Sequence, residues 1–418
     1  PKPSSAASDV YKRQCEKRAG VEHDFEKDGL DLIIRDGRLT ANGTTLGGDN
    51  GVAVALMLMV LDDDEIEHPP VECVFTTEEE VGLNGAKALD KSVLKARTMI
   101  NMDSEDEGVA TVSCAGGLRV QFTKEIQRTT VQGSLLTLKV EGLLGGHSGQ
   151  DIDKERQNAD LLMARMIQRL LKETKGQLVS FNGGTKDNAI PRECEASLIY
   201  ESDEEAAKAE ELACELAETY AEELTPAEPD FSCEISCETN RTAEAIPQDA
   251  AKEFICAMRL APNGIQKRNI KMDGFVVVSL NLGVVRTEED RIVMIFSPRS
   301  SVASLQEDTK ERLNTLAETF GFTVSHSSEY PGWSFKEDSP VREICKESYK
   351  ELFGEDLKIE AIHAGLECGL FSDAIKGLDA IAIGPTIANC HTPDEYLTLD
   401  SFERFYEFLK DILSRLAK

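Results

Sequence analysis

Acidic residues follow two strand-like segments at the points where those segments end. The apolar segment VECVFTT is followed at once by Glu78, Glu79 and Glu80, and Asp103 ends the segment MINMD. In an open α/β sheet, ligands bind beyond the carboxyl ends of the strands. Carboxylates at such an edge could hold a cation or exchange a proton with a substrate. The alternative is a solvated acidic face, which is common in a chain with 76 Asp and Glu residues.

A glycine-rich loop, TTLGGDNG, places Asp49 just before an apolar helix expected over residues 52–61. Such loops can bind phosphate, but this one offers an acid and neither Lys nor Arg, so its charge suits a cation. Taken singly, Asp49 and Asp103 could equally be a helix cap and a turn residue.

Two of the six histidines have unusual surroundings. His391 lies in GPTIANCHTPDE, just past a predicted strand, and His147 lies in GLLGGHSGQDI, between glycines and a helix start. Asp49, Glu80 and Asp103 together with His391 would form a mixed oxygen and nitrogen site of the kind that zinc and similar cations accept.

The elements that must position these residues alternate between strands and helices, which is typical of an α/β domain. Before residue 116 we predict strands over 71–77, 99–105 and 109–114. After residue 330 the same alternation returns, with helices over 340–353, from 366 and over 400–417, and strands over 357–362 and 379–384.

The middle of the chain has long strands and long amphipathic helices instead. We predict strands over 135–142, 193–201 and 291–298, and helices over 152–173, 203–224 and 303–320. The sequence therefore predicts an α+β domain over 117–330 inserted into an α/β domain split between 15–116 and 331–418. Residues 1–14 are small and polar, then basic, and we expect them to be a non-native or disordered leader.

Composition limits the partners. With 46 Lys and Arg against 76 Asp and Glu, the net charge is −30, which excludes nucleic acid as a default partner and disfavours an anionic membrane surface. The longest apolar run, Val52–Leu61, is too short to span a bilayer, and no secretory signal is visible. The eleven cysteines include no C-x-x-C pair, so we expect reduced thiols and a cytoplasmic protein.

Eight ordered motifs resemble a known family. TLGGDNG, TTEEEVGLNGA, INMDSEDEG with CAGG, GLLGGHSGQDI, NAIPRE, SPRSS, HAGLECG and GPTIANCHTPDE are similar to the aminoacyl-histidine dipeptidases, the peptidase D or cytosolic β-Ala-His dipeptidase group of di-zinc exopeptidases. The resemblance runs from about His23 to the C-terminus. It implies a catalytic domain with a mixed sheet flanked by helices and an inserted lid or dimerisation domain.

The resemblance also implies roles for the acidic residues. Asp49 would bridge two divalent cations, with zinc expected and cobalt or manganese as alternatives, and the Asp49–Asn50 peptide would be cis. Glu80 and Asp103 would each bind one metal, and His391 would bind one as well. Glu79 would take a proton from the attacking water and pass it to the leaving amine.

Substrate-binding roles follow from the same resemblance. His147 would reach into the partner's site of a homodimer and stabilise the oxyanion. Asn188 and Arg299 would hold the substrate carbonyl and terminal carboxylate, since a guanidinium pairs bidentately with a carboxylate. Glu367 would face the substrate amine.

One feature departs from the family pattern. The family carries a His-x-Asp strand upstream of TLGGDNG, and its spacing from Asp49 places it near residues 8–12, where the chain reads SDVYK without histidine. We favour loss of a native N-terminus over a degenerate site. The chain as written would then lack one metal ligand, and we expect it to bind metal weakly and to be poorly active.

The sequence thus predicts a metal-dependent dipeptidase that cleaves unblocked dipeptides, Xaa-His or carnosine-like substrates among them. Two alternatives stay open: another amidohydrolase on the same scaffold, such as a tripeptidase, carboxypeptidase or deacylase, or an inactive scaffold form.

Overall fold

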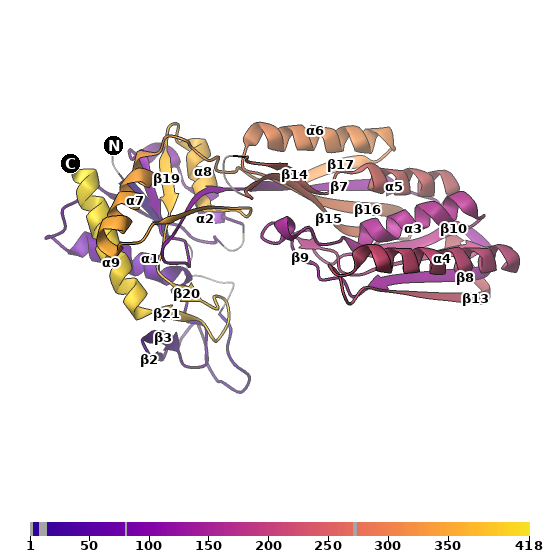
Figure 1. Ribbon diagram of the computed structural model, residues 1–418, viewed down its shortest axis with the longest axis horizontal. Coiled ribbons are helices and arrows are strands. Elements are labelled where there is room, and N and C mark those ends of the chain that lie inside the picture. Colours follow the sequence, from indigo (N-terminus) through magenta and orange to yellow (C-terminus); the bar gives the residue numbers. More distant parts are fainter. Residues whose placement is uncertain (1–2, 8–14, 80–81, 271–273) are drawn as a thin grey trace. The chain divides into compact units, whose positions relative to one another are not determined.

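The computed structural model describes residues 3–7, 15–79, 82–270 and 274–418 (Figure 1). The chain forms two compact units. The first contains the residues up to Ala115 and from Pro331 to Lys418, so it joins the two ends of the sequence, and the second is Gly116–Tyr330. The functions expected for these units, catalysis and a lid or dimerisation surface, remain predictions.

A six-stranded sheet forms the centre of the first unit. Its order is β18–β6–β19–β5–β1–β4, and every neighbouring pair is parallel except β19 and β6. All residues of β5 and β19 are buried, as expected for strands covered on both faces. The mixed α/β sheet predicted from the sequence is confirmed. The strands are β1 (Pro3–Ala7), β4 (Glu72–Phe75), β5 (Thr98–Asn101), β6 (Val109–Cys114), β18 (Lys358–Ile362) and β19 (Asp379–Ala382).

The leader differs from its prediction. We expected residues 1–14 to be a non-native or disordered leader; residues 3–7 are not disordered but form β1 and pair with β4 on one side and β5 on the other, and a non-native origin remains a prediction. A strand at this place gives the facing backbone groups of β4 and β5 a hydrogen-bonding partner, which composition alone does not reveal. Residues 8–12, near which the family spacing would place the His-x-Asp strand, lie outside the described residues.

Helices and a second, smaller sheet complete the first unit. The helices are α1 (Gly48–Asp62), α2 (Asn84–Ala88), α7 (Pro340–Phe353), α8 (Glu367–Ala374) and α9 (Leu399–Ala417), with a 3₁₀ turn at Lys91–Val93. The four-stranded sheet has the order β2–β3–β21–β20, from Leu32–Arg35, Arg38–Ala41, Tyr396–Thr398 and Ile387–Ala388. The pairing of β3 with β21 brings the segment before Asp49 close to the segment after His391.

The second unit is built on an antiparallel nine-stranded sheet. Its order is β13–β8–β12–β10–β15–β16–β7–β17, and β14 pairs with β15. The strands are β7 (Gly116–Glu125), β8 (Thr129–Glu141), β10 (Gln177–Gly183), β12 (Cys194–Tyr200), β13 (Ser232–Ala245), β14 (Gly264–Arg268), β15 (Val276–Thr287), β16 (Arg291–Ser300) and β17 (Thr323–Tyr330).

Four helices pack against this sheet around one core: α3 (Ala159–Glu173), α4 (Asp203–Leu224), α5 (Gln248–Leu260) and α6 (Ala303–Thr319). Met163, Ala209, Phe254 and Leu313, one from each helix, belong to the same buried cluster as the inward side chains of the strands. A helix was expected over 152–173, but α3 begins at Ala159, because Asn158 caps the amides of its first turn and residues 152–154 form only a short 3₁₀ turn.

None of the helices in the described part of the chain is long and apolar enough to cross a membrane. All eleven cysteines are described, and each is a free thiol, as we expected.

Asp160 is a fully buried carboxyl group in the first turn of α3. Its side chain lies against the backbone of Gly183, where a Cβ would come within 1.7 Å of Oδ1, and beside the thiol of Cys194. Burial raises the pKa of Asp160 to about 8, although Cys194 and the charge of Arg286 oppose this rise. The folded protein therefore holds a proton here that the unfolded chain releases near pH 4.

This proton predicts a specific pH dependence. Stability from the protonated carboxyl is fully present below pH 4 and is lost as the pH rises towards 8, by about 1.4 kcal/mol per pH unit. Asp160→Asn removes this loss, so in urea titrations it should stabilise the protein more at pH 7.5 than at pH 5. The exposed Asp153→Asn serves as the control and should change little at either pH. An Asp160→Asn effect that is the same at both pH values would contradict the assignment.

Candidate functional site

Asp49 lies at the start of α1, in the glycine-rich loop singled out by the sequence. Gly47 adopts the left-handed φ of 69° that lets the chain turn into the helix, and the Asp49–Asn50 peptide is cis, as the resemblance implied. The neighbouring Asn50 is buried and fixes this turn to the end of β5. Its Nδ2 donates to the Met102 carbonyl at 2.9 Å and to Oδ1 of Asp103 at 3.1 Å.

Asp103 lies two residues beyond the end of β5, and the hydrogen bond from Asn50 holds it beside the start of α1. The Asn101 side chain accepts a hydrogen bond from the Asp103 amide at 2.7 Å, which orients the residue as the strand ends. Burial raises the pKa of the Asp103 carboxyl well above its usual range, and the charges of Asp49, Glu79 and Glu367 raise it further. The carboxyl groups of Asp49, Glu79 and Glu367 therefore each lie within electrostatic reach of Asp103.

Of the two glutamates given split roles, the structure describes one. Glu79 is half-buried, its carbonyl accepts hydrogen bonds from Gly82 and Leu83, and its charge acts on Asp103. Glu80, predicted as a metal ligand, lies outside the described residues.

His391 reaches the same place from the other end of the sequence. It lies in the loop between β20 and β21, with a left-handed φ of 70°, and its Nε2 is 3.6 Å from Oδ2 of Asp49. The pKa of Asp49 is raised by burial, which His391 opposes. Two crowded carboxyl groups with raised pKa values and an adjacent imidazole are suited to a divalent cation, because its charge would offset their repulsion.

Glu367 is the first residue of α8 and is 1% exposed. Its negative charge raises the pKa of Asp103 and also acts on Lys91, which places this carboxyl group at the edge of the acidic cluster.

The sequence analysis missed Glu105, Cys390 and Glu395, which lie near this cluster. Ligand atoms of Glu105 and Cys390 and of the predicted ligand Asp49 lie within 4.8 Å of one another. Burial of its carboxyl group, followed by the charge of Asp49, raises the pKa of Glu105. Glu395, 2% exposed, accepts hydrogen bonds from the loop that carries Asp49. Each stands within four residues of a predicted ligand, but in an acidic chain adjacency alone does not single them out.

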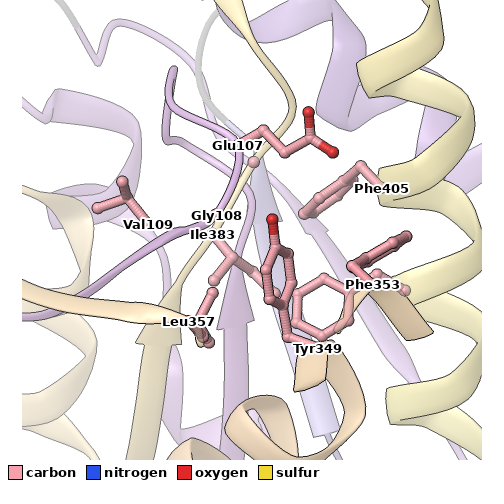
Figure 2. Close-up of a pocket in the computed structure, with 10 residues that line it drawn as sticks. Glu107, Gly108, Val109, Tyr349, Phe353, Leu357, Ile383 and Phe405 are labelled. Atoms are coloured by element: carbon pink, nitrogen blue, oxygen red, sulfur yellow. The ribbon is translucent and has the colours of Figure 1, made fainter. Parts of the chain in front are cut away.

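A small hollow in the first unit is lined by none of these residues. Figure 2 shows Tyr349, Phe353 and Phe405 among the side chains that line it, with Glu107 at its side. Glu107 is already paired with Arg404, at 2.6 and 2.5 Å. The hollow is largely aromatic and its carboxylate is neutralised, so it is a gap in core packing rather than the candidate site.

In the second unit, a two-stranded ribbon brings His147 and Asn188 together. β9 (Gly146–His147) pairs with β11 (Ala189–Ile190), and the Ser148 amide donates to the Asn188 carbonyl at 2.8 Å. A buried acid, Glu228, fixes the approach to this ribbon by accepting from the amides of Leu144 and Gln157 at 2.7 and 2.9 Å.

The His147 ring has a defined tautomer. The amides of Gly149 and Gln150 donate to Nδ1 at 3.3 and 3.0 Å, so Nδ1 carries a lone pair and the neutral ring has its proton on Nε2. Burial lowers the pKa of His147, and the charge of Arg299 lowers it further, while Asp151 opposes them. At neutral pH the ring can therefore donate a hydrogen bond from Nε2.

Arg299, on β16, is 7% exposed. Its Nη1 donates to the Tyr330 hydroxyl at 3.2 Å, but its Nε has no hydrogen-bond partner among the described residues. A buried guanidinium with an unused donor is suited to an anionic group of a ligand. His147, Asn188 and Arg299 thus belong to one region of the second unit, whereas the acidic residues belong to the first.

Comparison with known proteins places this chain in a family. The sequence model of "Peptidase family M20/M25/M40" matches residues 20–415. The cytosol non-specific dipeptidase of Escherichia coli (strain K12) is 34% identical over 407 residues, which cover 96% of this chain and 83% of that protein.

Solved structures agree with this placement. The aminoacylhistidine dipeptidase of Vibrio alginolyticus superposes with a TM-score of 0.93 at 34% identity, covering 99% of this chain and 84% of that one. The M20 family metallo-carboxypeptidase Sso-CP2 of Sulfolobus solfataricus has a TM-score of 0.50 at 14% identity, covering 100% and 85%, and shares the fold. The chain is therefore a hydrolase of peptide bonds and belongs to Peptidase family M20/M25/M40.

Proposed function

We propose that this protein is a metal-dependent dipeptidase that hydrolyses unblocked dipeptides, Xaa-His or carnosine-like substrates among them. The observation that carries the proposal is the gathering of Asp49, Asp103 and His391 from three distant segments at one place in the first unit. Two relatives that are 34% identical over nearly the whole chain are both named dipeptidases, which supports the same substrate class.

The residues present fit divalent cations. Two carboxyl groups with raised pKa values and one imidazole offer oxygen and nitrogen ligands, and we assign Asp49, Glu80, Asp103 and His391 to two ions, with zinc expected and cobalt or manganese as alternatives. When bound, such ions would polarise the scissile carbonyl and make water a better nucleophile at neutral pH.

Glu79 is assigned as general base. Its carboxyl group lies near enough to Asp103 to shift the pKa of that residue, so it stands beside the proposed ligands without being one. It would remove a proton from the attacking water and deliver it to the nitrogen of the leaving amine.

The second unit would supply recognition. The Nε2 proton of His147 would stabilise the developing oxyanion, Asn188 would orient the substrate carbonyl, and Arg299 would pair with the terminal carboxylate. With Glu367 facing the substrate amine, both ends of a dipeptide would meet an opposite charge, which favours short unblocked substrates over blocked ones.

We propose a homodimer, in which the partner subunit's His147 completes the site, and a cytoplasmic location. The free thiols, the acidic charge and the cytosolic name of the relative from Escherichia coli support the location. Nucleic acid and membrane surfaces are not proposed as partners.

The direct test assays purified protein, with and without a chelator, on dipeptides and on N-acyl amino acids, and compares Glu79→Gln with wild type. We expect slow, chelator-sensitive cleavage of dipeptides, because the chain has no histidine where the family pattern places one metal ligand. Glu79→Gln should lower kcat by a further factor of about 10²–10⁴ because the general base is lost. Glu78→Gln is the matched control, since its exposed side chain binds Asn84 through an oxygen that glutamine retains. A Glu79→Gln kcat within tenfold of wild type, or a preference for N-acyl substrates, would contradict the proposal.

Metal binding should also change stability. Because the pKa of Asp103 is raised, the stability from its protonated form is lost as the pH rises, so the metal-free protein is weakened at neutral pH. Asp103→Asn should therefore raise the melting temperature of chelator-treated protein at pH 7.5 and reduce the further rise on adding Zn²⁺. Asp106→Asn, an exposed neighbour, should leave both values unchanged. A lower melting temperature of chelator-treated Asp103→Asn, together with the same rise on adding Zn²⁺ as in wild type, would contradict the assignment of Asp103 to the metal site.

A further inference from the structure

Glu395 is an acid whose surroundings the proposed chemistry does not explain. It is 2% exposed, and both carboxylate oxygens accept hydrogen bonds from four successive backbone amides. Oε2 accepts from Leu46 and Gly47, each at 2.8 Å, and Oε1 accepts from Gly48 at 2.7 Å and from Asp49 at 3.2 Å. These contacts join parts of the chain more than 340 residues apart.

The four amides belong to the loop before the regular part of α1, since Asp49 and Asn50 have non-helical backbone angles and Asn50 Oδ1 caps the helix by accepting from the Ala53 amide at 3.0 Å. A carboxylate at this end also interacts favourably with the helix dipole. Among the described residues, no ion pair includes Glu395, so the backbone amides are what holds its charge. Glu395 therefore holds the backbone of the loop before α1 from a distant segment, and it contacts the backbone of Asp49 itself.

The same residue is tied to His391. It follows His391 by four positions, and the turn between them is held by its own hydrogen bonds. The Glu395 amide donates to the Thr392 carbonyl at 3.1 Å, and the Thr392 hydroxyl donates to the Asn389 carbonyl at 2.9 Å. A shift of Glu395 would therefore move His391 as well as the loop of Asp49.

We propose that Glu395 is a positioning residue that sets the separation of Asp49 and His391, now 3.6 Å between Oδ2 and Nε2, and thereby the affinity of this site for divalent cations. The inference rests on the metal site of the proposed function. Glu395 would act on the cations through the backbone of one ligand and the loop of the other.

Two substitutions disturb the hydrogen bonds of Glu395 in different ways. Gln in place of Glu395 keeps the length of the side chain but turns one acceptor oxygen into an NH₂ donor, which would face two backbone N–H groups. Gly48→Ala leaves the acid in place, but its Cβ would lie 3.2 Å from Oε1 and 3.4 Å from Ile387, so the carboxylate must shift. Glu403→Gln, on the exposed face of α9, is the control with the same change of charge.

The experiment measures Co²⁺ affinity of the full chain by competition with a chromophoric chelator, and records the visible spectrum of bound Co²⁺. We expect Glu395→Gln to bind Co²⁺ about ten- to a hundredfold more weakly, with an altered spectrum, because groups that orient metal ligands have effects of this size. Gly48→Ala should weaken binding in the same direction. At saturating metal, the kcat of Glu395→Gln should return towards the wild-type value although its metal affinity stays reduced, because Glu395 does not touch the reacting atoms.

Other outcomes distinguish a failure of the positioning role from a failure of the metal site. Equal Co²⁺ affinity and an unchanged spectrum in Glu395→Gln would overturn the positioning role and leave the proposed function standing, even if the melting temperature fell. If Glu395→Gln does not fold, Gly48→Ala decides by the same measurements. If wild type and Glu403→Gln both fail to bind Co²⁺, the metal site itself is wrong, and the inference falls with the proposed function.

Discussion

The central constraint on this structure is that several carboxyl groups are buried close together in the first unit. Burial raises the pKa of both Asp49 and Asp103, the charges of Asp49, Glu79 and Glu367 raise that of Asp103 further, and His391 opposes the rise at Asp49. A fold gains nothing from such an arrangement by itself, because each buried charge raises the cost of the next. The cost is understandable if a cation normally offsets it, and perturbed carboxyl groups of this kind are typical of functional sites.

The fold resists this repulsion by fixing the backbone that carries each acid. Asn50 ties the start of α1 to the end of β5, and Glu395 ties the same loop to the segment of His391. The second unit uses a similar device, since buried Glu228 fixes the chain on both sides of His147 through backbone amides. Side chains that contact only the backbone thus determine where the chemically active side chains lie.

Sequence patterns predicted most of the elements because local periodicity and turn residues determine them. The helix predicted over 203–224 matches α4. The helix predicted over 152–173 was too long, because Asn158 caps α3 and the helix begins only at Ala159. The ordered motifs identified the acidic residues and His391, but not Glu395 or Glu105. Their importance arises from contacts between distant segments, which no spacing along the chain encodes. Strand β1 was missed for the same reason, because its partners β4 and β5 determine it rather than its own composition.

The most direct test of this account is a crystal structure of the zinc-loaded protein, with anomalous scattering measured at the zinc edge. The account predicts metal peaks at about 2.0–2.2 Å from carboxylate oxygens of Asp49 and Asp103 and from Nε2 of His391, with Asp49 shared between two ions. Zinc bound at other residues, or an acidic cluster that stays without metal while zinc is present in excess, would contradict it.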